Sequence, residues 1–139
     1  MTLESLPVLD LSRLSAGPEK ASRFRADLRD AMHEVGFLYL AGHGIPPELT
    51  DSILEVSRRF FELPDEQKLA VENVNSPQFR GYTRVGGELT DGAVDWREQI
   101  DIGVERAVVE PKPGVADYWR LEGPNLWPDA LPEMRGIVL

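Results

Sequence analysis

The chain has 139 residues, of which 42% are hydrophobic and 28% charged, a composition typical of one soluble domain with its own core. Its net charge of −9 disfavours nucleic-acid binding, which needs a basic face, and no apolar run approaches the roughly 20 residues that span a bilayer. The absence of cysteine excludes disulfides and thiolate metal sites. Because the first residues also lack a basic secretory signal, we expect a cytoplasmic protein without nucleic-acid or membrane partners.

The first third of the chain predicts a strand, a helix and a second strand. Residues 7–11 alternate weakly and favour a short strand. A helix is expected from Pro18 to Gly36, because apolar residues recur at helical spacing. The stripe consists of Ala21, Phe24, Leu28, Met32 and Val35. Residues 37–41 then form an apolar run that predicts a buried strand leading into a tight turn.

The middle of the chain predicts two more helices. Pro47 begins the first, and four apolar residues on one face follow at spacings of 4, 3 and 4. They are Leu49, Ile53, Val56 and Phe60. Pro64 ends this helix, and residues 64–68 predict one or two further turns.

Regular structure is expected to be sparse in the last part of the chain. Residues 73–92 contain four glycines and a proline and predict an ordered loop. Gln99 to Glu105 alternates apolar and polar residues, which is typical of a half-buried strand. Pro132 and Glu133 indicate the start of a helix, and the sequence ends about two turns later, at Leu139. The sequence therefore favours a truncated domain.

Five short motifs occur in order along the chain. They read PVLD at residues 7–10, GFLYLAGHGIP at 36–46, RGY at 80–82, DWRE at 95–98 and GPNLWP at 123–128. Together they resemble the N-terminal region of the isopenicillin N synthase-like oxygenases, which depend on Fe(II) and 2-oxoglutarate. The chain departs from many members at Ala41-Gly42, where those members have Asn before the His-Gly pair.

The resemblance implies a fold and a place in a larger protein. The implied fold class is α/β (α+β): a mostly helical N-terminal segment with a few short strands. The strands at residues 8–11 and 99–105 would pair with a double-stranded β-helix (jelly-roll) core that this chain lacks. Residues 1–139 would then be a non-haem dioxygenase N-terminal domain, truncated before the catalytic jelly-roll domain.

No iron site is expected within this chain. Members of the family hold iron with a His-x-Asp/Glu motif and a second, distant His, whereas this chain has only His33 and His43. Neither histidine has an acidic residue two positions later. We predict that His43 fixes the turn through a backbone hydrogen bond and that His33 lies at the edge of the core or in solvent. The sequence therefore assigns no catalytic, cofactor-binding or metal-binding residue.

Arg80, Tyr82 and Glu88 are the candidate substrate-binding residues. In the enzymes that this chain resembles, an Arg and a Tyr of the RGY segment can contact the substrate, and Glu88 lies on the same loop. The structural alternative is a glycine turn in which Arg80 forms a salt bridge and Tyr82 packs as an aromatic side chain.

Two other motifs have structural interpretations. Asp95 and Glu98 are expected to cap backbone groups and to pair with Arg97 or Arg84. The GPNLWP segment predicts a rigid anchor in which Trp127 buries a large aromatic surface.

The resemblance implies that the chain is part of an oxidoreductase. The parent protein would use Fe(II), 2-oxoglutarate and O2 to hydroxylate, desaturate or cyclise a small-molecule substrate. This chain alone would be inactive, bind no cofactor and have the missing catalytic domain as its partner. A non-catalytic binding or interaction module is the alternative, and an independent metalloenzyme built on His33 and His43 is a third hypothesis.

Overall fold

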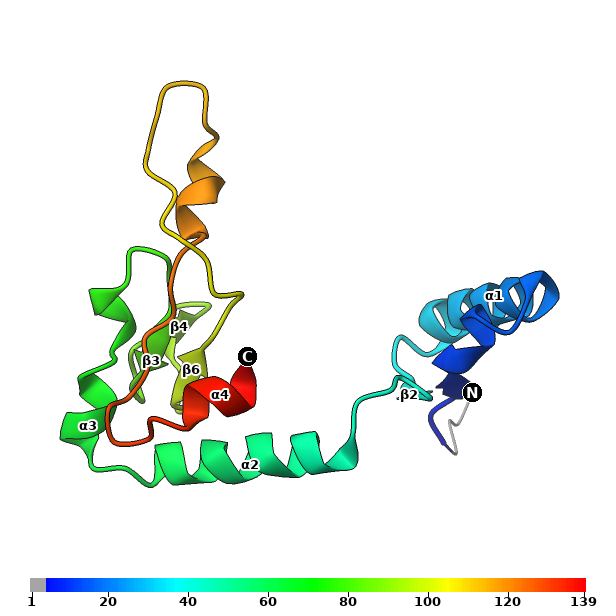
Figure 1. The fold of residues 1–139 in the computed structure, drawn as a ribbon, viewed down its shortest axis with the longest axis horizontal. Coiled ribbons are helices and arrows are strands. Elements are labelled where there is room, and N and C mark those ends of the chain that lie inside the picture. Colours follow the sequence, from blue (N-terminus) through cyan, green and yellow to red (C-terminus); the bar gives the residue numbers. More distant parts are fainter. Residues whose placement is uncertain (1–4) are drawn as a thin grey trace. The chain divides into compact units, whose positions relative to one another are not determined.

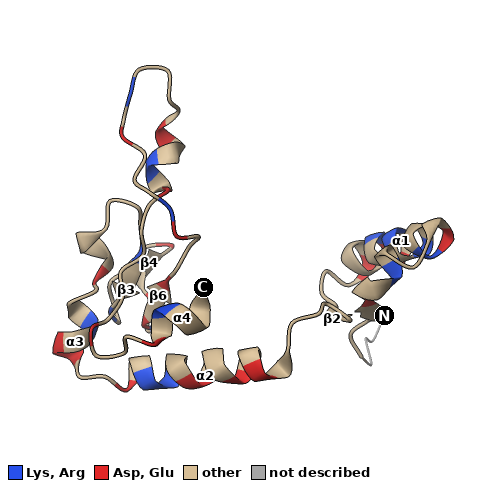
Figure 2. Ribbon diagram, in the orientation of Figure 1, with Lys and Arg blue, Asp and Glu red and all other residues tan. Residues whose placement is uncertain are grey.

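The computed structural model describes residues 5–139, which form two compact units that divide between Pro46 and Pro47 (Figure 1). Helices and strands are mixed in both units. None of the helices in the described residues has the length and apolar character needed to cross a membrane. Figure 2 shows acidic and basic residues mixed along α1 (Pro18–Glu34), whereas in α2 (Pro47–Phe61) the acidic residues precede the two basic residues of the last turn.

The first unit confirms the predicted strand, helix and strand. It comprises β1 (Val8–Asp10), the 3-10 helix η1 (Leu11–Leu14), α1 and β2 (Tyr39–Ala41). β1 and β2 are parallel, with Leu9 opposite Leu40. Leu9 packs with Phe24 and Ala31 of α1, so the helix covers the two-stranded sheet as in a β-α-β unit.

Two details of the first unit differ from the sequence prediction. Met32 is 52% exposed, and Ala31 is buried in its place because the stripe continues three residues after Leu28 rather than four. The predicted buried strand is also wrong, since Phe37 is 72% and Tyr39 62% exposed. Only Leu38 of residues 37–41 packs in this core, because a single helix covers the sheet.

The second unit contains the remaining elements. In chain order they are α2, α3 (Asp65–Leu69), η2 (Asn73–Asn75), β3 (Gly81–Thr83), β4 (Leu89–Thr90), β5 (Ala93–Val94), β6 (Gln99–Asp101), η3 (Asp117–Leu121) and α4 (Met134–Val138). The predicted helices near Pro47, Pro64 and Pro132 are confirmed, with α4 starting two residues after the proline.

The core of the second unit lies between the helices α2 and α4 and the strand β3. Phe60 and Val56 of α2 pack with Met134 of α4 and with Tyr82 of β3. The predicted stripe of α2 is therefore buried only in its second half. Its first half is partly exposed, with Ile53 at 37%.

The strands of the second unit correct the prediction of an ordered loop over residues 73–92. β3 lies in that range and pairs antiparallel with β6, while β4 pairs with β5 in a hairpin. The strand predicted at Gln99 to Glu105 is shorter than expected, because the ladder ends at Asp101. The described strands form three two-stranded sheets, so pairing of β1 or β6 with a jelly-roll sheet stays a prediction.

Candidate functional site

The β3–β6 pair has one apolar face and one polar face. Side chains alternate between the two faces of a strand. Tyr82 and its partner Ile100 belong to the core of the second unit. Thr83 and its partner Gln99 therefore lie on the opposite face, together with Asp101.

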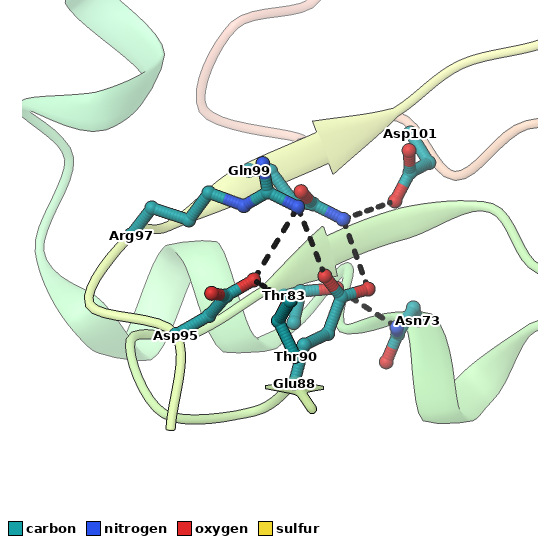
Figure 3. Close-up of polar contacts among 8 residues, drawn as sticks. All are labelled: Asn73, Thr83, Glu88, Thr90, Asp95, Arg97, Gln99 and Asp101. Carbon is teal, nitrogen blue, oxygen red and sulfur yellow. Dashed lines mark hydrogen bonds and ion pairs between the residues drawn. The ribbon is translucent and has the colours of Figure 1, made fainter. Parts of the chain in front are cut away.

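Gln99 is the centre of this polar face. Its amide Nε2 donates to Oε1 of Glu88 at 3.0 Å and to Oδ2 of Asp101 at 3.1 Å (Figure 3). One side-chain amide thus holds two carboxylates close together. The second oxygen of Asp101 accepts no hydrogen bond from the described residues.

Further polar contacts surround Gln99. Asn73 donates to the hydroxyl of the buried Thr83 at 2.8 Å. Arg97 reaches Glu88 at 3.4 Å and Asp95 at 3.5 Å, but its own side chain is 63% exposed. Figure 3 shows two carboxylates beside Arg97 and a third, that of Asp101, beside Gln99, which makes this face rich in hydrogen-bond acceptors.

The opposite side of β3 carries a second polar group. The hydroxyl of Tyr82 donates to Oε2 of Glu98 at 2.7 Å, and Lys68 donates to the same oxygen at 2.8 Å. The hydrogen bond from Lys68, followed by that from Tyr82, lowers the pKa of Glu98, and the bond to Glu98 raises the pKa of Lys68. Burial, followed by the bond to Glu98, raises the pKa of Tyr82. These groups are a structural ion pair and hydroxyl that satisfy one another.

This group corrects one sequence prediction and confirms another. Glu98 does not pair with Arg97 or Arg84; it turns toward the core side of the strand, where α3 supplies Lys68. Asp95 does pair with Arg97, as predicted.

The guanidinium of Arg80 contacts main-chain carbonyls rather than a carboxylate. Nη1 donates to the carbonyls of Gln78 at 2.9 Å and Phe79 at 3.3 Å, and Nη2 donates to that of Leu121 at 3.2 Å. The salt bridge expected for Arg80 in the structural alternative is therefore absent among residues 5–139.

The three candidate substrate-binding residues have separate surroundings. Tyr82 is 4% exposed and packs edge-on against Phe60, with ring centroids 5.9 Å apart. Glu88 alone belongs to the polar face. Sequence reasoning did not identify Gln99 and Asp101, although the alternation from Gln99 to Glu105 already placed both on one side of a strand.

The GPNLWP segment is an anchor, as predicted. Asn125 is buried, and its side-chain amide pairs with both backbone groups of Gly103, at 2.8 and 2.9 Å, as a neighbouring strand would. Trp127 packs against the core of the second unit.

The residues present do not fit an iron site. No group of three or more His, Asp or Glu side chains in residues 5–139 is placed to hold a metal ion. His43 instead accepts a hydrogen bond from the backbone N–H of Ile45 at 3.0 Å, which confirms its predicted role in the turn, and His33 is exposed.

Comparison with known protein families shows to which family the chain belongs. Residues 6–130 match the family model described as "non-haem dioxygenase in morphine synthesis N-terminal". The chain belongs to this family. The resemblance seen in the five motifs is thereby confirmed.

Relatives in the family are longer proteins. The 2-oxoglutarate-dependent dioxygenase frbJ of Dothideomycetidae sp. (strain 11243) is 45% identical over 130 residues, which are 92% of this chain and 34% of that protein. A homoarginine-6-hydroxylase of Arabidopsis thaliana is 35% identical over 97% of this chain and 42% of its own length. The chain thus spans about a third to two-fifths of these relatives.

Solved structures share the fold. A full-length Neurospora crassa protein, crystallised in complex with alpha-KG, superposes with a TM-score of 0.70 at 26% identity, over 99% of this chain and 42% of that one. A putative 2OG-Fe(II) oxygenase family protein from Caulobacter crescentus gives 0.69 at 25% identity, over 98% and 42%. The mixed helix and strand arrangement is therefore that of part of an oxygenase.

Proposed function

We propose that this chain is the N-terminal part of an oxygenase that uses Fe(II) and 2-oxoglutarate to oxidise a small molecule. The main support is the family match over residues 6–130 together with relatives named 2-oxoglutarate-dependent dioxygenases. The iron and the cosubstrate would be held by the part of the protein that lies outside these residues. The chain itself would shape the substrate cavity.

Turnover by the complete protein tests this proposal. The protein would be supplied with Fe(II), 2-oxoglutarate and candidate substrates, and succinate would be measured. Homoarginine and thymine are the first compounds to assay, because one relative is named a homoarginine-6-hydroxylase and one structure of the Neurospora crassa protein contains thymine. Succinate formed only with a substrate supports the proposal. A folded complete protein that neither binds 2-oxoglutarate in calorimetry nor forms succinate with any compound would instead favour a non-catalytic binding module.

We further propose that the polar face of β3 and β6 lies on the substrate side of the cavity. The core of the second unit occupies one face of the two strands. The polar face offers the carboxylates of Glu88 and Asp101 as hydrogen-bond acceptors. Such a face suits a substrate that donates N–H groups, as both homoarginine and thymine do.

Neutralising Asp101 tests the assignment. With an N–H-donating substrate of the complete enzyme, Asp101→Asn should raise KM by about tenfold or more, because a hydrogen bond to a charged acceptor contributes about 1.5–3 kcal/mol. Asp91→Asn, in the exposed turn between β4 and β5, is the control and should leave KM unchanged. An unchanged KM in Asp101→Asn would overturn the placement of this face on the substrate side, but it would leave the proposed reaction standing.

A further inference from the structure

A tight turn at residues 76–80 precedes β3. The hydroxyl of Ser76 accepts hydrogen bonds from the backbone N–H groups of Gln78 and Arg80, both at 3.3 Å. Phe79, between them, has a φ of 58°, a left-handed conformation that bulky residues rarely adopt. The turn is thus held in an unfavourable conformation by its own hydrogen bonds, which fixes the direction of the side chains on either side of Phe79.

A long loop, residues 104–121, begins and ends beside this turn. It leaves the strands of the second unit and returns to them, as the yellow and orange segment of Figure 1 shows. Glu105 forms an isolated bridge with Gly123, and Asn125 pairs with Gly103. The two ends of the segment therefore meet, and η3 lies between them near its second end.

Two glycines at the ends of the loop lie under side chains of the turn. A Cβ built on Gly103 would lie 2.5 Å from Cζ of Arg80, and one built on Gly123 would lie 2.8 Å from Cδ of Gln78. Real Cβ atoms essentially never approach this closely, so a side chain at either position would force Arg80 or Gln78 to move. The side chains of the turn therefore rest directly on the backbone at both ends of the loop, and only glycine permits this approach.

Arg80 adds directional bonds to this packing. Its Nη2 donates to the carbonyl of Leu121, the last residue of η3, across 41 positions of sequence. Its Nη1 donates to two carbonyls of its own turn. Nε is buried and has no hydrogen-bond partner in the described residues. The guanidinium is therefore held against the loop with one N–H unsatisfied, which costs free energy.

We propose that Arg80 is a latch that fastens loop 104–121 to the turn before β3, and that the loop opens when the guanidinium is displaced. The planar fork bridges two segments of main chain, which a lysine ammonium cannot do with the same geometry. Asn125 holds the base of the loop through Gly103, and Arg80 holds the next point outward, at Leu121. The proposal does not depend on the oxygenase reaction.

Hydrogen exchange in the complete protein tests the latch. The readout is the peptide covering residues 116–123, in which the amides of Trp119 and Glu122 bond to the carbonyls of Ala116 and Trp119. Arg80→Lys, which keeps the charge, should raise the exchange rate of this peptide by about tenfold or more, because a charge-assisted hydrogen bond is lost. Gly103→Ala should have the same effect, since the added methyl group displaces the guanidinium while Arg80 remains.

The double variant tests whether the two substitutions act on the same guanidinium. If they do, Arg80→Lys combined with Gly103→Ala should exchange no faster than the faster single variant. Arg84→Lys is the control, because Arg84 follows β3, is 56% exposed and, within residues 5–139, pairs with Glu72 alone. Unchanged exchange in a folded Arg80→Lys protein, or additive effects in the double variant, would overturn the proposal.

Discussion

At the scale of single residues, Gly42 combines two constraints at the turn after β2. Its φ of +64° lies in the region that glycine adopts most easily, and a Cβ there would lie 3.2 Å from Cγ of Asp10. Asp10 in turn accepts the N–H of Ser12 at 2.9 Å and caps η1. Hydrogen bonding by the Ser12 side chain, followed by that of its backbone N–H, lowers the pKa of the Asp10 carboxyl. One missing side chain thus permits both the turn and the cap.

Replacing Gly42 should therefore cost more than backbone strain alone. We expect Gly42→Ala to lower the free energy of unfolding by about 2 kcal/mol, because the strained φ and the disturbed cap each cost about 1 kcal/mol. Gly44→Ala is a matched control: its φ of +78° carries similar strain, but nothing lies within 4 Å of the new methyl group. Denaturant unfolding of the complete protein would measure both, and equal losses would show that the contact with Asp10 contributes nothing.

Single residues also show how far sequence reasoning extends. The role of His43 was predictable, because a His between two glycines after a strand has few partners other than the adjacent backbone. The partners of Arg80 were not. A sequence shows that a guanidinium is present, but its acceptors are carbonyls 1, 2 and 41 positions away, and only the closed loop brings the last of these near.

At the scale of elements, Lys68 joins α3 to β6. Its side chain is only 8% exposed, and it bonds to Glu98 of the segment leading into β6 as well as to Asp65 on its own helix. The ammonium also lies 5.5 Å from the centre of the Tyr82 ring. A five-residue helix is too short to be stable by itself, so this ion pair helps to fix it.

Removing the ammonium should destabilise the second unit. We expect Lys68→Met to lower the free energy of unfolding by about 2–3 kcal/mol, less than for a fully buried pair because Glu98 remains 30% exposed. Combining Lys68→Met with Glu98→Leu should recover part of the loss, since the unpaired carboxylate is then also removed. Denaturant midpoints would report both, and a single variant as stable as the natural protein would refute this role for Lys68.

The same ion pair predicts a dependence of stability on pH. The pKa of Glu98 in the folded protein is lowered, so its contribution is fully present above the ordinary value of 4.5 and is lost as the pH falls through the folded value. The pKa of Lys68 is raised, so its contribution persists until the pH rises above 10.5. Measured from pH 7 down to pH 3, the free energy of unfolding should fall less steeply in Glu98→Gln than in the unaltered protein. Parallel curves would contradict the assignment.

Helices were more predictable than strands for a physical reason. α1 and α2 extend over four turns or more, so their apolar stripes repeat several times. β3 has three residues, one of them Gly81, and shows no periodicity of its own. It becomes a strand only through its pairing with β6. The strand predicted to extend to Glu105 was too long. The sequence keeps alternating beyond Asp101, but at Gly103 the backbone groups bond to the side chain of Asn125 instead of to a neighbouring strand.

At the scale of the whole molecule, the first unit by itself leaves apolar surface uncovered. Val8 of β1 is 66% exposed, Phe37 72% and Tyr39 62%. Parallel strands are normally covered on both faces, whereas one helix covers this pair. This surface agrees with the prediction that β1 joins the jelly-roll core of the complete protein.

Residues 1–139 prepared alone should therefore self-associate. We expect light scattering after gel filtration to show oligomers or aggregates for the isolated chain, because exposed apolar strands promote association. Phe37→Ser combined with Tyr39→Ser should reduce the association. A monodisperse monomer of the unaltered chain would contradict the prediction.

The family was predictable at this scale, but the polar face was not. Five motifs in order were sufficient to identify the oxygenase family, since their spacing spans most of the chain. Gln99, Asp101 and Glu88 come together only through the register of β3 with β6 and the hairpin that precedes β6. Two sequence positions on one side of a strand reveal a shared face, but not which third residue will reach it.

The glycines at the base of loop 104–121 also bear on protein engineering. The Glu105–Gly123 bridge and the side chain of Asn125 close the base, so the outer part of the loop is not needed to hold β3 against β6. A fluorescent tag or an unrelated peptide could thus be spliced between residues 110 and 115 while the rest of the domain keeps its arrangement. Such a graft would supply a reporter on a protein whose termini need not be altered.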